Sequence, residues 1–169
     1  MMKIYLDMDG VLADFFGGLE KHFDVPHWKQ IPKTEESILN LKGTDFFNQL
    51  DPYPSSNELV TFVINLAGPN NWGINSSPLR GDRDNSAYWK RVWLTRHFMM
   101  PKVENLIFTG RKEQFATDRF DGTANVLVDD KPDNVSRWIA KGGIGIRYQA
   151  NEDSLVDLKR KLIKSVESS

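Results

Sequence analysis

The sequence predicts an α/β fold: a mostly parallel sheet with helices on both faces and a small helical cap inserted after the first strand. Three observations support this prediction. Short apolar runs alternate along the chain with longer segments whose apolar residues recur at helical spacing. Most of the short runs end in polar residues, at the place where open α/β sheets bind their ligands. One interval near the N-terminus breaks the alternation with prolines and aromatic residues.

The short apolar runs predict five strands. The first begins almost at the N-terminus and ends at an Asp-x-Asp-Gly turn. Helical segments separate the later runs, which favours parallel pairing. We expect strands at Ile4–Leu6, 72–75, Leu106–Phe108, 126–128 and Ile144–Arg147.

The helices are predicted from apolar stripes. Residues 12–23 place two leucines and three phenylalanines on one face. Gly68 and Pro69 end the next helix, and Pro132 suits the first turn of another. We expect helices at 12–23, 57–67, 86–98, Pro132–Ala140 and 155–166.

The interval 24–53 departs from this pattern. Pro26, Pro32, Pro52 and the adjacent Pro54 interrupt short mixed segments that are dense in aromatic residues. Prolines at this spacing fit neither a sheet nor one long helix. We therefore expect a cap of short helices. This divides the chain into an α/β core at 1–13 and 55–169 and a small helical cap at 14–54.

The composition narrows the function classes. The chain has 169 residues, with 22 Lys and Arg against 23 Asp and Glu, and a formal net charge of −1. This balance argues against binding of a long nucleic acid or a membrane through bulk charge. Cysteine is absent, which excludes thiolate zinc sites, iron–sulfur clusters and cysteine nucleophiles. No long apolar run opens the chain, so we expect a cytoplasmic protein; a homodimer is compatible with the sequence.

Four of the five predicted strands end in residues that can do chemistry. Because carboxyl ends of parallel strands meet at one edge of the sheet, we expect these residues to form one site. Unpaired carboxylates gathered there would repel one another, and a divalent cation resolves the repulsion. Oxygen ligands without histidine or cysteine favour Mg²⁺. The four endings are Asp7 with Asp9, Ser76 with Ser77, Arg111 with Lys112, and Asp129 with Asp130.

The second and third endings supply what a phosphate group needs. Lys112 offers a point charge, and the hydroxyls of Ser76 and Ser77 offer neutral donors. Arg111 is the nearest substitute for Lys112. Carboxylates with a metal on one side and a lysine with hydroxyls on the other describe a site of phosphoryl transfer.

The first ending supplies the reacting groups. Metal binding would keep Asp7 ionised and shield its approach to an anionic phosphate, which makes it a candidate nucleophile. Asp9 is placed to protonate the leaving oxygen and then to activate water. Gly10 allows the chain to turn sharply beside the phosphate.

These residues carry a family resemblance. Asp7-Met8-Asp9-Gly10-Val11, then Ser76, Lys112 and Asp129-Asp130, resemble the four ordered motifs of the haloacid dehalogenase superfamily of phosphohydrolases. Longer stretches at 7–15, 46–54, 76–80 and 128–133 resemble the 5'(3')-deoxyribonucleotidase family. The resemblance covers roughly residues 3–148.

The resemblance implies a Rossmann-like core with a small helical cap. It also implies Mg²⁺-dependent removal of phosphate from nucleoside monophosphates, above all deoxynucleoside monophosphates, through an aspartyl-phosphate. By position, Asp130 matches a metal ligand, Asp129 a ligand through water or a support, and Asp9 also offers its backbone carbonyl to the metal. Phe15 matches a residue that lines the base pocket, and Arg80 falls where the family has a substrate-contacting lysine.

Two further hypotheses stay open. The same chemistry would serve another small phosphomonoester, such as a sugar phosphate, or a nucleic-acid 3'-phosphate. A non-catalytic binding domain with this fold is the third hypothesis, although all the reacting groups are present. Lys90 and Arg91 lie on the tryptophan-rich helix 86–98 and are expected to be surface charges.

Overall fold

The computed structural model describes residues 1–169 and has one five-stranded sheet. The strand order is β3-β2-β1-β4-β5, and every neighbouring pair is parallel. The predicted α/β fold is therefore confirmed, with a sheet that is parallel throughout. The strands are β1 (Ile4–Leu6), β2 (Trp72–Ser76), β3 (Leu106–Phe108), β4 (Val126–Asp129) and β5 (Ile144–Arg147).

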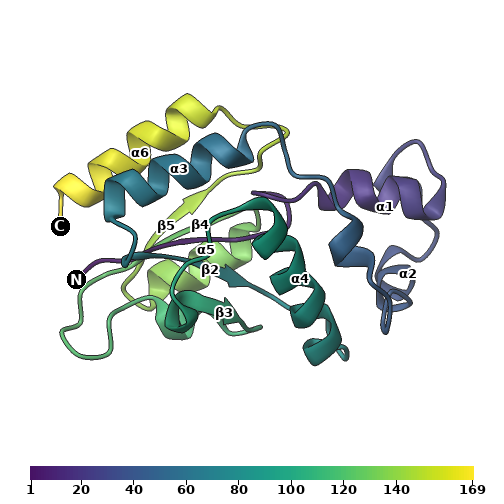
Figure 1. The fold of residues 1–169 in the computed structure, drawn as a ribbon, viewed down its shortest axis with the longest axis horizontal. Coiled ribbons are helices and arrows are strands. Elements are labelled where there is room, and N and C mark those ends of the chain that lie inside the picture. The colour runs from purple at the N-terminus through teal and green to yellow at the C-terminus, as the bar shows by residue number, and fades with distance from the viewer.

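Helices cover both faces of the sheet, as predicted. Figure 1 shows α3 and α6 lying together on one side, while α5 lies on the other. Side chains alternate along β1 accordingly. Ile4 and Leu6 belong to the large core cluster with the leucines of α3 and α6, whereas Tyr5 packs in a smaller cluster with Trp138 of α5. These helices are α3 (Ser56–Ala67), α5 (Pro132–Ala140) and α6 (Leu155–Glu167).

The first helix begins later than predicted. The sequence pattern placed its start at residue 12, but α1 is Phe15–Phe23. Residues 10–13 instead form a turn in which the Met8 carbonyl accepts from the backbone N–H groups of residues 11, 12 and 13. The Asp14 side chain then accepts from the Gly17 N–H and caps the helix. Leu12 is buried in the turn and not on the helix face.

The interval between α1 and α3 contains short helices, as predicted. Figure 1 shows α1 and α2 at the end of the molecule toward which β1 runs, which is the carboxyl edge of the sheet. Two phenylalanines of η2 are buried in the same large core cluster as the sheet. The short helices are η1 (Trp28–Gln30), α2 (Thr34–Leu39) and η2 (Phe46–Gln49).

The remaining elements complete the carboxyl edge. The helix α4 (Arg83–His97) starts three residues before its predicted beginning and packs against η2. Trp93 of α4 donates from Nε1 to the Leu50 carbonyl at 2.7 Å, which ties α4 to the end of the inserted segment. The short helix η3 (Val103–Asn105) precedes β3, and η4 (Lys112–Phe115) follows it.

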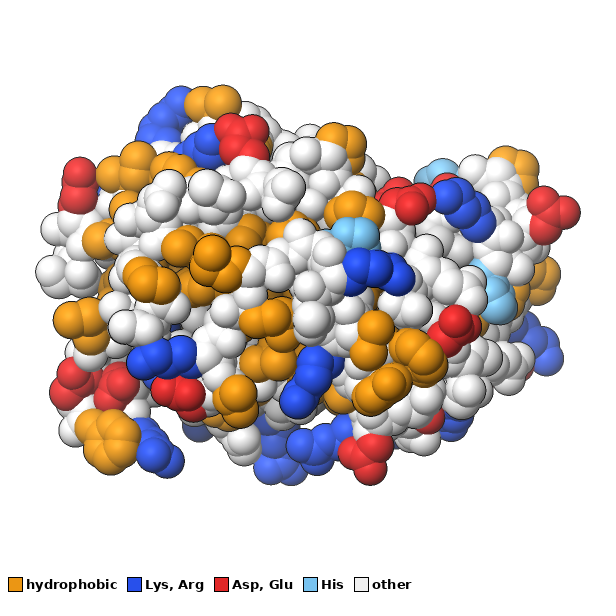
Figure 2. Space-filling model, viewed as in Figure 1, with side chains coloured by type: hydrophobic (Ala, Val, Ile, Leu, Met, Phe, Trp, Pro, Cys, Tyr) orange, Lys and Arg blue, Asp and Glu red, His pale blue; other side chains and the backbone are white.

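The surface carries charges of both signs. Acidic and basic side chains lie scattered among apolar ones on the face shown in Figure 2, which agrees with the net charge of −1. A membrane-spanning helix would need greater length and apolarity than any helix of this structure has.

Candidate active site

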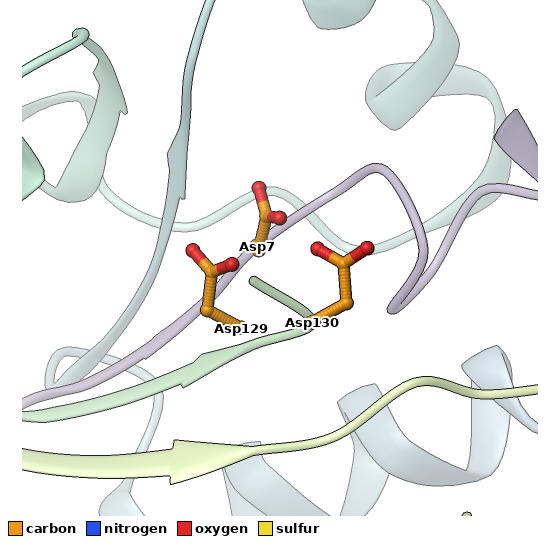
Figure 3. Close-up of side chains that lie close together, drawn as sticks. All are labelled: Asp7, Asp129 and Asp130. Carbon is orange, nitrogen blue, oxygen red and sulfur yellow. The ribbon is translucent and has the colours of Figure 1, made fainter. Parts of the chain in front are cut away.

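Three carboxylates meet where β1 and β4 end. Asp7 follows β1, Asp129 is the last residue of β4, and Asp130 follows it. Because β1 and β4 are neighbours in register, oxygen atoms of all three side chains lie within 4.8 Å of one another. Figure 3 shows the three carboxylates pointing toward a common space. All three residues are buried.

Lys112 compensates two of these charges. Its side chain is 2% exposed, and its Nζ lies 2.8 Å from Asp7 Oδ1 and 2.7 Å from Asp129 Oδ2. Burial by itself would lower the pKa of Lys112, but the carboxylates of Asp7 and Asp129 outweigh it and raise that pKa. Arg111, the alternative considered from the sequence, is exposed and makes no ion pair with them.

The two adjacent aspartates have different surroundings. Asp129 Oδ1 accepts from the Lys131 backbone N–H at 2.9 Å, and Oδ2 accepts from Lys112. Asn134 Nδ2 lies 3.2 and 3.1 Å from these two oxygens. Asp130, in contrast, accepts no hydrogen bond, and burial together with the carboxylates of Asp7, Asp129 and Asp9 raises its pKa to about 8.

These surroundings fit a hard cation. Asp130 is a buried carboxylate with no partner of its own, and Asp7 Oδ2 also accepts no hydrogen bond. The backbone carbonyl of Asp9 is likewise free of backbone hydrogen bonds. An all-oxygen set of this kind, with two carboxylates and a carbonyl, is the donor chemistry that Mg²⁺ prefers. The Asp129 carboxylate already accepts from Lys131, Lys112 and Asn134, so it has less capacity left for a cation.

Gly10 brings the turn after β1 close to Asp130. Its φ is +84°, and a Cβ on this residue would lie 2.4 Å from Asp130 Oδ2. Both facts make a side chain here unfavourable, because it would strain the backbone and push against the Asp130 carboxylate. The glycine in the Asp-x-Asp-Gly turn therefore makes room for the carboxylate.

Lys90 is not a surface charge, and the sequence-based expectation for it was wrong. Its side chain is 1% exposed, and its Nζ donates to Asp9 Oδ2, Ser76 Oγ and the Ser77 carbonyl, each at 2.8 Å. The reason lies in α4, where Ser86, Lys90, Trp93 and Leu94 are all buried at helical spacing. Arg91 is exposed as expected.

A cleft of about 440 Å³ opens beside these groups. Its apolar wall includes Phe15 and Phe47, whose rings are nearly parallel at 8° with centroids 6.2 Å apart. Charged and uncharged polar residues complete the lining. The lining residues are Asp7, Asp9, Phe15, Phe16, Glu35, Ile38, Leu39, Phe47, Ser77, Pro78, Leu79, Arg80, Asp130, Lys131 and Asn134.

The structure brings the sequence-predicted residues together. Six of them line the cleft itself: Asp7, Asp9, Phe15, Ser77, Arg80 and Asp130. Ser76, Lys112 and Asp129 are buried directly behind it, in contact with its carboxylates or with Lys90. Gly10 lies against Asp130. Arg80 is exposed and forms no hydrogen bond or ion pair within the chain.

This combination defines a class of protein. A parallel sheet in the order observed, with paired aspartates following β1 and β4 and a helical insertion after β1, is the haloacid dehalogenase-like α/β architecture. A solved structure described as a dehalogenase matches with a TM-score of 0.55 over 91% of this chain and 87% of that chain. Its sequence is 14% identical, so it supports the fold alone.

Residues 1–160 match the family described as 5' nucleotidase, deoxy (pyrimidine), cytosolic type C protein, and the chain belongs to this family. Two curated relatives are named 5'(3')-deoxyribonucleotidase, mitochondrial. The relative from Mus musculus is 29% identical, and the match covers 78% of this chain and 66% of the relative. The one from Homo sapiens is 26% identical, with 78% and 63% covered. The chain thus spans slightly less than two thirds of the length of these relatives.

Proposed function

We propose that the protein is a Mg²⁺-dependent phosphatase that releases phosphate from deoxynucleoside monophosphates, as a 5'(3')-deoxyribonucleotidase. One observation carries the proposal: Asp7, which pairs with Lys112, lines the same cleft as the partnerless Asp130 and a stacked aromatic wall. Membership of the deoxynucleotidase family supports the same activity.

Asp7 is the proposed nucleophile. Its Oδ1 is held by the Met8 backbone N–H and by Lys112, both at 2.8 Å, which fixes the carboxylate at the end of β1. An oxygen of Asp7 forms a bond to phosphorus while the bond from phosphorus to the ester oxygen breaks. Lys112 uses two of its three donors on carboxylates, so the third is available for a phosphate oxygen. The hydroxyls of Ser76 and Ser77 are the other proposed phosphate donors.

Asp9 is the proposed acid and base. It lines the same cleft, and its Oδ1 is buried without a hydrogen-bond partner. In the first step the Asp9 carboxyl gives its proton to the departing ester oxygen. In the second step the Asp9 carboxylate takes a proton from the water that attacks the aspartyl-phosphate, which releases inorganic phosphate and restores Asp7.

Asp7, Asp130 and the Asp9 carbonyl are the proposed metal ligands, with Asp129 as support or as a ligand through water. Bound Mg²⁺ would offset the negative charge of the carboxylates and of the phosphate. Asp130 has no other partner for its charge, which supports its place among the direct ligands.

The aromatic wall is the proposed contact for the base. Phe15 comes from α1, and Phe47 from η2. Both lie in the segment 14–54, which we propose as a cap that selects the substrate above a core formed by 1–13 and 55–169. Arg80 at the rim carries a charge with no partner in the chain and is a proposed contact for the substrate. A small nucleotide fits a cleft of about 440 Å³.

Phosphate release from a panel of nucleoside 5'- and 3'-monophosphates and sugar phosphates tests this function. We expect release with Mg²⁺, concentrated on deoxynucleotides, and none with a chelator. Asp7→Asn should abolish release, whereas Asp133→Asn, the same change at an exposed position, should keep it. Release spread over sugar phosphates would retain the chemistry and reject the nucleotide substrate.

The cellular location and the oligomeric state of the protein are also proposals. We keep the expectation of a cytoplasmic protein, although the two curated relatives are named as mitochondrial. Fractionation of cells that express the tagged full chain would decide between these compartments. Analytical ultracentrifugation would show whether the chain is a monomer or a homodimer.

A further inference from the structure

Lys90 connects three elements at the carboxyl edge. Its ammonium contacts Asp9 after β1, Ser76 and Ser77 at the end of β2, and the ring of Phe47 in η2, whose centroid is 4.6 Å from Nζ. None of the roles proposed for Asp7, Asp9, Lys112 and Asp130 involves this side chain. A fully buried lysine is rare unless its charge is paired, so its place needs an explanation.

The donor count shows how Lys90 acts. An ammonium group has three N–H donors, and Lys90 has three acceptors at 2.8 Å. Its donors are therefore all used within the protein. Lys112 differs because it has two acceptors and keeps one donor for a ligand. Lys90 can affect a substrate only through the groups that it holds.

Two of those groups are proposed reacting or binding groups. Asp9 accepts from Lys90 through Oδ2, so the carboxyl group cannot rotate freely, and Oδ1 is left without a partner. Ser76 accepts from Lys90 through Oγ, which leaves its own O–H as a donor. One ammonium thus fixes which oxygen of Asp9 is free and which way the Ser76 hydroxyl points.

The helix that carries Lys90 is itself held in place. At its start, Ser86 Oγ accepts from the Leu79 N–H at 2.9 Å and donates to the Asp82 carbonyl at 2.8 Å. One turn beyond Lys90, the Trp93 indole donates to Leu50. These contacts on both sides of Lys90 restrict the position of its ammonium.

We propose that Lys90 is a positioning residue, which orients the Asp9 carboxyl so that Oδ1 exchanges the proton with the leaving oxygen and sets the Ser76 hydroxyl as a phosphate donor. The proposal rests on the proposed phosphatase function. Lys90 keeps its own three protons throughout. The proton that reaches the leaving oxygen comes from Asp9.

Two substrates with different leaving groups test this role. The leaving group of a nucleotide is a sugar alkoxide, which needs a proton. The leaving group of p-nitrophenyl phosphate is a stable phenolate, which does not. In Lys90→Met we expect kcat/KM for the nucleotide to fall by about 10²–10³-fold, and kcat/KM for p-nitrophenyl phosphate by less than about tenfold. We compare kcat/KM because it reports the steps up to release of the leaving group and leaves out the hydrolysis of the aspartyl-phosphate, which both substrates share. The fall in rate that both substrates share measures the effect on Ser76 and on the fold. The additional fall in rate on the nucleotide measures the effect on proton transfer by Asp9.

Arg91→Met is the matched control, because it removes the exposed charge next in the helix. It should leave both rates within about twofold. Equal losses on the two substrates in Lys90→Met would overturn the proposal and leave Lys90 a structural residue.

A second variant covers the case in which Lys90→Met does not fold. The double variant Asp9→Asn with Lys90→Met removes both charges of the buried pair, so neither is left uncompensated. If Lys90 acts through Asp9, adding Lys90→Met to Asp9→Asn should change the residual nucleotide rate by less than about threefold, apart from the loss also seen with p-nitrophenyl phosphate. A further large and selective loss on the nucleotide would refute the proposal.

Failure of the proposed deoxynucleotidase function can be told apart from failure of the proposal for Lys90. If the unaltered protein hydrolyses p-nitrophenyl phosphate and no nucleotide, the deoxynucleotidase function fails. The comparison for Lys90 can then be made with the alkyl phosphate that the enzyme does accept.

Discussion

A methyl group on Gly10 should disturb the proposed metal site through Asp130. The φ of Gly10 is +84°, and an added Cβ would lie 2.4 Å from Asp130 Oδ2 and 2.7 Å from Asp130 Cγ. These distances are far below normal contact, and the end of the Asp130 side chain is the part that can yield. Gly10→Ala is therefore expected to turn the Asp130 carboxylate away from Asp7.

Gly122 provides a control for the backbone part of this effect. Its φ is +72°, and nothing lies within 4 Å of the place where its Cβ would be. A side chain at a left-handed backbone position costs about 1–2 kcal/mol of stability. Gly122→Ala should lose that amount and keep its response to Mg²⁺. Gly10→Ala should lose at least as much stability, and a displaced ligand should raise its half-saturating Mg²⁺ concentration by about tenfold or more.

Urea unfolding and the Mg²⁺ dependence of phosphate release measure the two effects separately. Both variants should unfold at lower urea than the unaltered protein, and Gly10→Ala alone should need more Mg²⁺. If Gly10→Ala required no more Mg²⁺ than Gly122→Ala, then Asp130 would be able to move without cost to the site. The inference that Asp130 binds the metal directly would fail.

Three further predictions concern the charged residues of the site. Asp9→Asn should lower kcat by about 10²–10⁴-fold with the fold intact, as followed by phosphate release and circular dichroism. Lys112→Met should cost about 3–5 kcal/mol in urea unfolding, because Asp7 and Asp129 would lose their shared partner. In chelator, stability should fall as the pH rises from about 4 to about 8 and level off above that, because the folded pKa of Asp130 lies above its unfolded value. Asp130→Asn should remove that slope.

The sheet could be predicted from the sequence almost to the residue. Strands buried on both faces read as continuous apolar runs, and their ends are marked by polar residues. Three predicted strands, Ile4–Leu6, Leu106–Phe108 and Ile144–Arg147, have the observed bounds. The start of α1 could not be predicted in this way. Leu12 continues the apolar stripe in sequence, but the turn at Met8 and the cap at Asp14 use the backbone groups that a longer helix would need.

The residues of the candidate site that lie at strand ends could be predicted from the sequence, whereas Lys90 could not. Asp7, Ser76, Lys112 and Asp129 each follow or end a strand, so topology alone brings them to one edge. Lys90 lies in the middle of a helix. Its residue type indicated the surface, although its spacing from Ser86, Trp93 and Leu94 placed it on the buried face. Residue type and helical spacing thus give opposite indications for Lys90, and nothing in the sequence decides between them.

The two buried lysines at the carboxyl edge differ in how many of their N–H donors are already used within the protein. Lys112 pairs with the proposed nucleophile Asp7 and keeps one donor for the substrate. Lys90 pairs with the proposed acid Asp9 and keeps none. A change at Lys112 should therefore affect every phosphate ester alike, because all esters share the phosphoryl group. A change at Lys90 should depend on the leaving group, because an alkoxide needs the proton delivered by Asp9 and a phenolate does not.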